Sequence, residues 1–369
     1  MLQHQILIDD VCAGYQLKDG DLLVRKAFGT CMRFSLSDEF PLDRNDSVVF
    51  TEVVAELLWL LSGSSSNLSL NELGSHRRDH AALHRDEIEL QPKTSTQLVK
   101  DLAVKLQLDP RLVGNMLSMA DQLEPPSEDP SVTLSGARRL LVEKGISLDH
   151  EITRIPQGSL GQTEGAVWRN CNEIDQITVL IEQLRDNPMG RPHVLIGWDV
   201  GSMHKYERGQ YQLNVQCGFA AEEPRIPLMQ FMVREMSGRE RSLAASRKGV
   251  FIPDDLAIIE LVNLLDEADI PKLALDCCVY QQRGNPLSDV PFVTAVCALL
   301  IELLARSTGM GAGKLNHFVG ETWMTEDEIQ SLDPQPLHKP SNCGRLHFTP
   351  SADLKETIFD LTPEDIELI

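Results

Sequence analysis

The stretch VTAVCALLIELLARSTG at residues 293–309 is apolar on almost every side when it is drawn as a helix. In a water-soluble protein such a helix has to be covered by other elements, since its apolar faces gain free energy only when water is excluded from them. We therefore predict a central buried helix over these residues. The rest of the fold has to pack around it.

Strand-like and helix-like segments follow one another in this chain without a regular alternation. Strands are predicted at 22–42, 193–198, 211–220, 226–235 and 272–280, and helices at 47–62, 173–186 and 254–267. A protein built from strand–helix–strand units would alternate more strictly. The order observed favours the α+β class, with a sheet packed on the central buried helix.

The composition is that of an ordinary globular protein with one strong bias toward acidic residues. Hydrophobic residues make up 42% and charged residues 24% of the 369 residues, and the formal net charge is −21. An acidic surface argues against direct binding of nucleic acid, whose phosphates need basic partners. It does not exclude a small anionic substrate that is held in a locally basic pocket.

The eight cysteines form no C-x-x-C pair and no zinc pattern, and several of them, such as Cys297, lie in apolar runs. This usage is typical of reduced cysteines in a cytosolic protein. The N-terminal residues are acidic where a signal peptide would be basic, and no uncharged apolar stretch reaches about 18 residues. We therefore expect a cytoplasmic protein without a membrane span and without a metal site.

Residues from about 64 to 155 differ in character from the segments on either side. They contain the polar runs SGSSSNLS and SHRRDHAALHRDE, and QLEPPSEDPS at 122–131 combines three prolines with three acidic residues. Such a composition is typical of surface loops and linkers. We expect this region to be an insertion relative to the compact core.

Seven motifs occur in one consistent order along the chain. They are FGTCMRFSLSDEFPL running into AELLWLLSG, GSLGQTEGAVWR, DQI, NPMGRPHVLIGWDVG, DVPFVTAVCALL, TGMGAGKLNHFVGETW and TIFDLTPEDIELI. Together they resemble the thymidylate synthase superfamily, which includes the deoxypyrimidine hydroxymethylases. The resemblance implies a single domain over residues 1–369, with unmatched insertions at about 64–155 and about 236–270.

The resemblance also implies a reaction. In that family a cysteine thiolate adds to C6 of a pyrimidine nucleotide monophosphate, and C5 then attacks a one-carbon unit carried by a folate. For this chain it implies methyl or hydroxymethyl transfer, with 5,10-methylenetetrahydrofolate as the cofactor. It further implies a homodimer.

The position of the nucleophilic cysteine is ambiguous in this chain. The best local match to its strand, EPRIPLMQFMV, places Arg225 there, while counting from Trp198 without a gap places Tyr211 there. A third alignment, through DIPKLALDCC, places Cys278 there. The same segment also matches the following strand of the family, in which case Cys277 and Cys278 are ordinary strand residues. Cys278 is thus the candidate catalytic thiol.

The residues expected around a nucleotide are only partly retained. Glu56 matches the carboxylate that organises a proton network near the base, and a carboxylate on an apolar helix needs a partner or a role. The candidate substrate-binding residues are Trp168, Arg191, Arg225, Arg283 and Asn285. Arg283 stands one residue after Gln282, which replaces the family's arginine, and a slip of one residue in a strand turns a side chain to the other face.

Other family positions are changed outright. Val293 replaces the asparagine that reads the base, and Trp323 and Thr325 replace the histidine and tyrosine that bind the sugar. Two hypotheses follow. The chain is an enzyme with a changed substrate or chemistry, in which Cys278 or Cys217 supplies the thiol. Alternatively, it is a non-catalytic homologue that binds a nucleotide or a partner protein.

Overall fold

The computed structural model describes residues 2–19, 22–42, 48–79, 87–91, 151–155, 158–161, 163–191, 193–198, 224–253, 255–332 and 344–369. Its contacts divide the chain into two compact units, one formed by Met1–Ala82 with Gly158–Ile369 and one by Leu83–Gln157. The single domain predicted over 1–369 is therefore one unit with a second compact unit inserted into it. Residues 64–82, where the expected insertion begins, belong to the first unit.

The second unit contains two of the described strands. β3 (Glu87–Gln91) and β4 (Glu151–Ile155) pair antiparallel, with Glu87 opposite Ile155. The strand predicted at 211–220 belongs to the first unit and lies outside the described residues.

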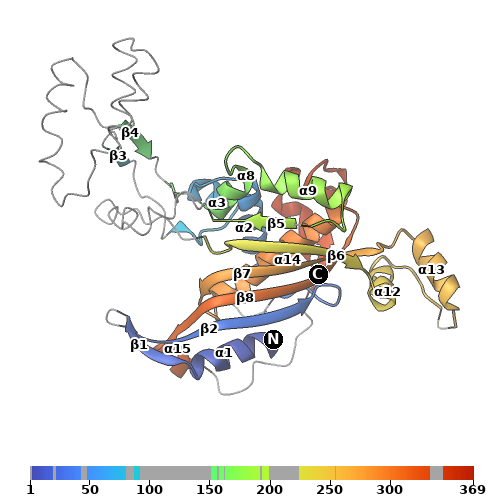
Figure 1. The fold of residues 1–369 in the computed structure, drawn as a ribbon, viewed down its shortest axis with the longest axis horizontal. Helices are drawn as coiled ribbons and strands as arrows, with labels where there is room; N and C mark the ends of the chain where they lie inside the picture. The colour runs from blue at the N-terminus through green and yellow to red at the C-terminus, as the bar shows by residue number, and fades with distance from the viewer. Residues whose placement is uncertain are drawn as a thin grey trace, which may run out of the picture. The chain divides into compact units, whose positions relative to one another are not determined.

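A six-stranded sheet forms the framework of the first unit (Figure 1). Its order is β1 (Tyr15–Asp19), β2 (Leu22–Ser35), β8 (Gly311–Thr325), β7 (Leu273–Gly284), β6 (Leu228–Glu235) and β5 (His193–Ile196). Neighbouring strands pair antiparallel except β7 and β8, which are parallel because helix α14 (Asp289–Ser307) connects them. This mixed sheet with packed helices confirms the predicted α+β class.

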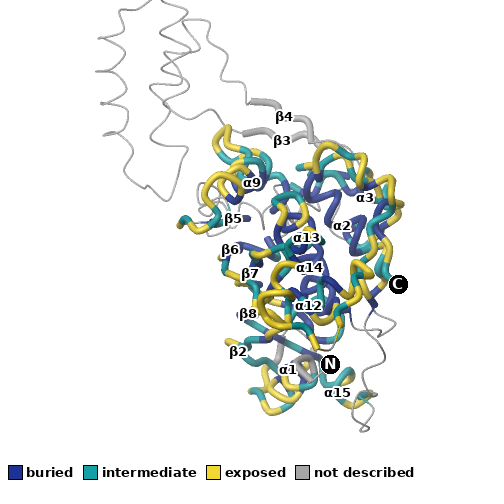
Figure 2. The backbone as a smooth tube through the Cα atoms, turned by 90° about the vertical axis from the view of Figure 1, so that its right-hand side faces the viewer, coloured by how far each residue is buried: buried dark blue, intermediate teal, exposed yellow. Residues whose placement is uncertain are grey.

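Helix α14 lies at the centre of the core. Nearly all of it is buried, and so is most of helix α2 (Phe50–Ser62), which packs beside it (Figure 2). Both helices pack on buried side chains of the sheet such as Phe231, Cys277 and Leu315. The predicted central helix is confirmed, although it begins at Asp289 rather than at residue 293. By length and composition alone α14 could cross a membrane, but its burial is that of a core helix.

Shorter elements complete the first unit. They are α1 (Leu2–Cys12) on β2, α3 (Asn67–Glu72) after α2, α8 (Glu164–Arg169) on α2, α9 (Gln176–Asp186) on β5, and α15 (Glu326–Ser331) after β8. The C-terminal region contains β9 (Leu346–Phe348), three short 3-10 helices (Ala352–Leu354, Ile358–Asp360 and Pro363–Asp365) and β10 (Ile366–Leu368). β9 and β10 pair antiparallel.

The insertion predicted at 236–270 forms two helices between β6 and β7, α12 (Gly238–Arg247) and α13 (Ile258–Glu267). Their apolar residues meet in a small core of their own that includes Leu265. Arg234 on β6 links α12 to the sheet, since its guanidinium donates to Glu240 at 2.6 Å and to Asp276 of β7 at 2.8 Å. The helix predicted at 254–267 is confirmed in type but begins at Ile258.

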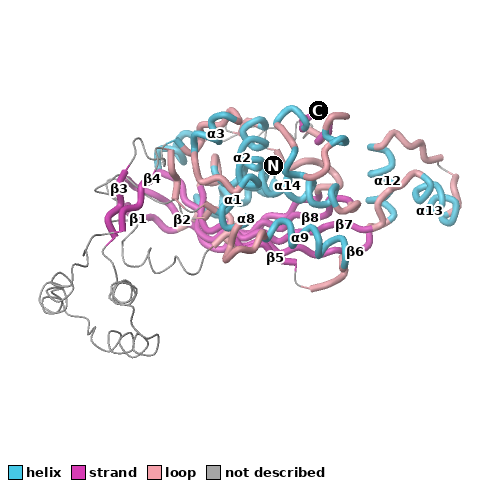
Figure 3. The backbone as a smooth tube through the Cα atoms, turned by 90° about the horizontal axis from the view of Figure 1, so that it is seen from above, coloured by secondary structure: helices cyan, strands magenta, loops and turns pink. Residues whose placement is uncertain are grey.

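The sheet has two different faces. In the view from above, α2 and α14 lie on one side of it (Figure 3). On the other face, the pairing registers align an apolar row across four strands, formed by Ile196, Leu228, Tyr280 and Phe318. These four side chains are between 39% and 43% exposed. We call this row the outer sheet row.

Candidate functional site

The predicted carboxylate Glu56 belongs to a buried group of three charged residues. The Arg78 guanidinium donates from Nε to Glu56 Oε1 at 2.7 Å, and a terminal nitrogen lies 2.6 Å from the same oxygen. Arg78 also donates to Glu164 Oε1 at 3.0 Å, and its guanidinium lies 4.8 Å from the centre of the Trp59 ring. Glu56, Arg78 and Glu164 are each no more than 2% exposed. We call these three residues the triad.

Local packing explains how the triad forms. Glu56 lies in the middle of α2, where the neighbouring residues from Val53 to Leu61 are buried and apolar. Glu164 lies in the first turn of α8. A Cβ atom at Gly165 would lie 2.5 Å from the carbonyl oxygen of Leu60, so a glycine is required for α8 to approach α2 this closely. The close approach brings both carboxylates within reach of one guanidinium.

Sequence reasoning missed Arg78. It lies in the polar run SHRRDH, which the pattern assigns to an exposed loop, yet it is 1% exposed. One signal could have found it, because a carboxylate on a buried helix requires a cation and Arg77 and Arg78 are the nearest arginines that follow Glu56 in the chain. Arg77 lies 3.6 Å from Glu52 and stacks over Phe292 at 4.0 Å.

The triad adjoins one end of the sheet. A Cβ atom at Gly197, directly after β5, would lie 3.1 Å from Glu164 Cβ and 3.2 Å from Trp168 Nε1. The Arg225 carbonyl, just before β6, accepts a hydrogen bond at 3.4 Å from the Gln282 amide near the end of β7. The predicted site residues at this end of the sheet are Trp168, Arg225 and Arg283.

The buried polar atoms that have no hydrogen-bond partner among the described residues include two beside the triad. They are Glu56 Oε2 and Trp168 Nε1. Leaving such atoms without a partner costs free energy, so a water molecule or a ligand atom there would stabilise the protein. Since Glu56 Oε1 is held by Arg78, Oε2 is the atom through which this carboxylate can contact anything else.

The structure does not bring the candidate thiol to Glu56. Neighbouring residues of a strand point to opposite faces, and Cys277 is buried against the core that contains α2 and α14. Cys278 is exposed on the opposite face, where the Asn316 side-chain amide contacts its sulfur at 3.7 Å. The alignment that makes these cysteines ordinary strand residues fits this geometry.

Two other thiols in the described core are poor nucleophiles. Burial raises the pKa of Cys277, with a further contribution from Cys297 of α14. Burial also raises the pKa of Cys297, and the nearby charge of Glu164 adds to the effect. A thiol whose pKa is raised holds its proton at neutral pH and cannot act as a thiolate. Cys217 lies outside the described residues.

Two predicted ligand residues have other surroundings. The side chain of Asn285 is engaged within the protein, since its amide nitrogen donates to Glu328 at 2.9 Å and its oxygen accepts from the Leu287 amide at 2.8 Å. These two bonds hold the turn before α14. Arg191 is exposed in the turn before β5, and β5 runs from there toward Gly197, so Arg191 does not join the residues beside the triad. Within the described ranges, no group of three or more histidine, cysteine or acidic residues is placed to hold a metal ion.

Comparison with known proteins agrees with the motifs. The family model described as thymidylate synthase matches residues 16–217 and 259–369. A thymidylate synthase of Leuconostoc mesenteroides is 23% identical over 357 residues, which cover 94% of this chain and 86% of that protein. The family match covers far more than half of the chain. It leaves out residues 218–258, which contain the whole of α12. This chain therefore belongs to the thymidylate synthase family.

Proposed function

We propose that this chain is a non-catalytic member of its family, which acts as a binding or interaction protein in the cytoplasm. The observation that carries the proposal is the closed triad. Glu56, the carboxylate expected to serve the base of a nucleotide, is instead bonded to Arg78 within the protein. A group that stabilises the fold through two short contacts is poorly suited to move protons during a reaction.

The placement of sulfur supports the same conclusion. Addition to C6 of a pyrimidine requires a thiolate on the side of the sheet where Glu56 lies, because one ring has to contact both groups. Cys278 points to the other side, and burial raises the pKa of Cys277 and of Cys297. The transferase hypothesis then depends on Cys217.

The Trp59 ring beside Glu56 is a poor place for the folate cofactor of the family to stack. The Trp59 ring next to the triad is already covered by the Arg78 guanidinium at 4.8 Å. An aromatic ligand would have to displace a buried cation from two carboxylates before it could stack there, and breaking a buried ion pair is costly. We therefore propose that 5,10-methylenetetrahydrofolate is not used.

The outer sheet row supports the interaction role. Ile196, Leu228, Tyr280 and Phe318 form a continuous apolar line across the sheet, and such exposed patches mark interfaces in other proteins. The proposed partner is a second copy of this chain, which would give the homodimer that the family implies. Sedimentation over a wide range of protein concentrations tests this, and a monomer throughout would contradict it.

Tritium release tests the absence of catalysis. The purified protein is incubated with dUMP, dCMP or CMP that carries tritium at C5, with and without 5,10-methylenetetrahydrofolate. We expect no release above the level of heat-inactivated protein, because exchange at C5 requires a thiolate adduct at C6. A thymidylate synthase assayed in parallel shows that the reagents are active.

Two cysteine variants make the negative result interpretable. If tritium is released and Cys217→Ser abolishes the release while Cys278→Ser does not, the chain is a transferase and the proposal is wrong. Release that is lost in Cys278→Ser would show that the exposed thiol reaches a nucleotide, for example in a partner copy, and would contradict the proposal equally.

The sheet end beside the triad favours a second role, binding of a pyrimidine nucleotide monophosphate without turnover. Arg225 and Arg283 supply positive charge there, and Trp168 supplies a buried ring with a free indole N–H among the described residues. Guanidinium groups suit phosphate because they donate in pairs. We expect dUMP, dCMP or CMP to raise the melting temperature and Arg283→Gln to weaken the effect. No shift with any of these nucleotides would leave the interaction role alone.

A further inference from the structure

A cavity lies at the end of the sheet opposite the triad. It has a volume of about 380 Å³ and is bounded by α12, the C-terminal half of α14, the segments that begin β7 and β8, and Phe348 of β9. That volume lies at the lower end of the range for small-molecule sites. The triad adjoins the other end of β7, beyond Gln282, so the cavity is not part of the site described above.

Part of the cavity is built from residues that the family match leaves out. The match omits residues 218–258, and this segment supplies Glu240, Arg247 and Lys248 to the lining. The insertion therefore adds charged side chains to the end of a helix that belongs to the common fold. Side chains added in this way can form a new ligand site on a fold that the family shares.

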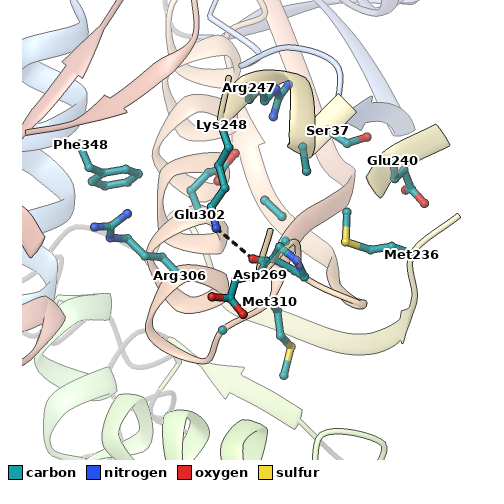
Figure 4. A pocket seen from close by; sticks show the side chains of 15 residues that line it. Ser37, Met236, Glu240, Arg247, Lys248, Asp269, Glu302, Arg306, Met310 and Phe348 are labelled. Atoms are coloured by element: carbon teal, nitrogen blue, oxygen red, sulfur yellow. Dashed lines mark hydrogen bonds between the residues drawn. The ribbon is translucent and has the colours of Figure 1, made fainter. Parts of the chain in front are cut away.

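Most of the charges around the cavity already have partners. Glu240 accepts hydrogen bonds from Arg234, and Arg306 pairs with Asp353 and stacks over Phe348. The Lys248 ammonium donates to the backbone carbonyls of Ala268 and Asp269 at 3.3 and 2.9 Å, and the second of these bonds is drawn in Figure 4. These groups shape the walls but are largely satisfied by the protein itself.

Glu302 and Arg247 differ from these lining charges. Glu302 has neither a hydrogen bond nor an ion pair with any described residue, although its side chain is only partly exposed. Burial raises its pKa to about 7, against an opposing effect of the Arg247 charge. With described residues Arg247 makes only two hydrogen bonds, both long, at 3.4 and 3.5 Å, to the Leu36 carbonyl, and burial lowers its pKa.

The two groups face one cavity without contacting each other. They are close enough for each charge to act on the other, yet they do not form an ion pair within 4.0 Å. Burying a charged group without a partner costs free energy. A ligand that pairs with both Glu302 and Arg247 would remove that cost. An anionic group suits the guanidinium fork, and an ammonium group suits the carboxylate.

We propose that this cavity binds a small zwitterion, with an α-amino acid as the simplest representative, whose carboxylate contacts Arg247 and whose ammonium contacts Glu302. Four charges that line the cavity have no ion-pair partner in the described part of the chain. Two are positive, Arg247 and Lys248, and two are negative, Glu302 and Asp269. This balance favours a ligand of zero net charge over a simple anion such as phosphate. The role goes beyond the proposed function, because it uses none of the residues beside the triad.

Thermal shift with defined probes tests the proposal. The full-length protein is heated with each of the common amino acids at about pH 8 and at about pH 6. We expect at least one to raise the melting temperature, and its N-acetyl and amide derivatives to fail because each lacks one of the two charges. Inorganic phosphate and methylamine, which carry one charge each, are expected to have no effect.

The pH dependence gives an independent readout. The groups that face Glu302 across the cavity are Arg247, Lys248, Arg306, Asp269 and Glu240, and Arg345 and Asp38 act on Arg247. Only ionised Glu302 can pair with an ammonium group. With a pKa of about 7 in the free protein, the affinity should fall about tenfold between pH 8 and pH 6.

Matched variants locate the site. Glu302→Gln and Arg247→Gln should each weaken binding at least about tenfold. Glu267→Gln on α13 and Arg239→Gln on α12 change the same charges at exposed positions outside this cavity and should bind as the wild type does. Circular dichroism establishes that each variant is folded.

Several results would overturn the proposal. They are no shift with any amino acid, equal shifts with the N-acetyl or amide derivatives, and unchanged binding by both cavity variants. A shift by phosphate that grows as the pH falls would instead identify an anion site and would contradict the zwitterion.

Discussion

Glu56 and Glu302 are carboxylates on the largely buried helices α2 and α14, but their surroundings differ. Glu56 accepts two short contacts from Arg78 and is 1% exposed. Glu302 has no partner among the described residues, and burial raises its pKa to about 7. Beside the triad, one oxygen of the Glu56 carboxylate is thus held by pairing within the protein. The opposite end of the sheet, to which the insertion adds α12, carries an open charge beside a cavity.

The difference shows how a buried charge can be interpreted. A buried ion that is fully paired within the protein is part of the structure, and removing its partner is costly. A buried ionisable group without a partner costs free energy because it has lost its water. Such a group is a candidate for a ligand contact. By this reasoning, the contacts of Glu56 with Arg78 are those of a structural group. Glu302, which lies on a helix of the common fold beside the added helix α12, has the features of a ligand contact.

Breaking the triad should give the largest effect. Arg78→Met leaves Glu56 and Glu164 as two buried carboxylates without their cation, and we expect a loss of about 3–5 kcal/mol in the free energy of unfolding. Urea denaturation at neutral pH measures it. Arg77→Met is the matched control, because its contact with Glu52 is longer, at 3.6 Å, and the Arg77 side chain is 20% exposed. We expect a loss of about 1 kcal/mol there, and equal losses in the two variants would show that the triad is not special.

Detaching the insertion should have an intermediate effect. Arg234→Gln removes the contacts of this guanidinium with Glu240 of α12 and with Asp276 of β7. We expect a loss of about 2 kcal/mol in the free energy of unfolding, because the site is partly exposed. Arg234 lowers the pKa of Glu240 to about 2. The stability from this pair is therefore complete above the ordinary glutamate pKa of about 4.5 and is lost as the pH falls toward about 2.

Hydrogen exchange localises the same effect. Amides of α12 should exchange faster in Arg234→Gln, while those of α14 should remain protected. Arg239→Gln on the same helix is the control, since this side chain is 83% exposed and lies 3.9 Å from Asp38. Unchanged exchange in α12 after Arg234→Gln would mean that its small apolar core, not the charge network, fixes the insertion.

The elements that bury apolar residues could be predicted from the sequence. The helix over 293–309 and the strand at 272–280 both correspond to observed elements, because their patterns record contact with the core. The candidate site was less accessible. Arg78 lies in a run whose polarity indicates an exposed loop, and its burial depends on a tertiary contact with α2 and α8 that leaves no local pattern. Sequence alignment also could not settle the face of Cys278, because a slip of one residue reverses it.

The smallest effect should come from Glu302→Gln, and its sign is opposite to that of the other two changes. The folded pKa of about 7 lies above the ordinary value of 4.5, so the folded state holds a proton that the unfolded state releases between these values. Wild-type stability therefore falls as the pH rises from about 4.5 to about 7 and then stays level. Glutamine has no such proton, so the variant should be more stable than the wild type above neutral pH. The expected gain in the free energy of unfolding is on the order of 1 kcal/mol. It is less than the full pKa shift would give, because the side chain is partly exposed.

Unfolding curves of the Glu302→Gln variant and the wild type at about pH 5 and about pH 8 measure the difference. A variant that is less stable at the higher pH would show that Glu302 is paired, and the contrast between the two ends of the sheet would disappear.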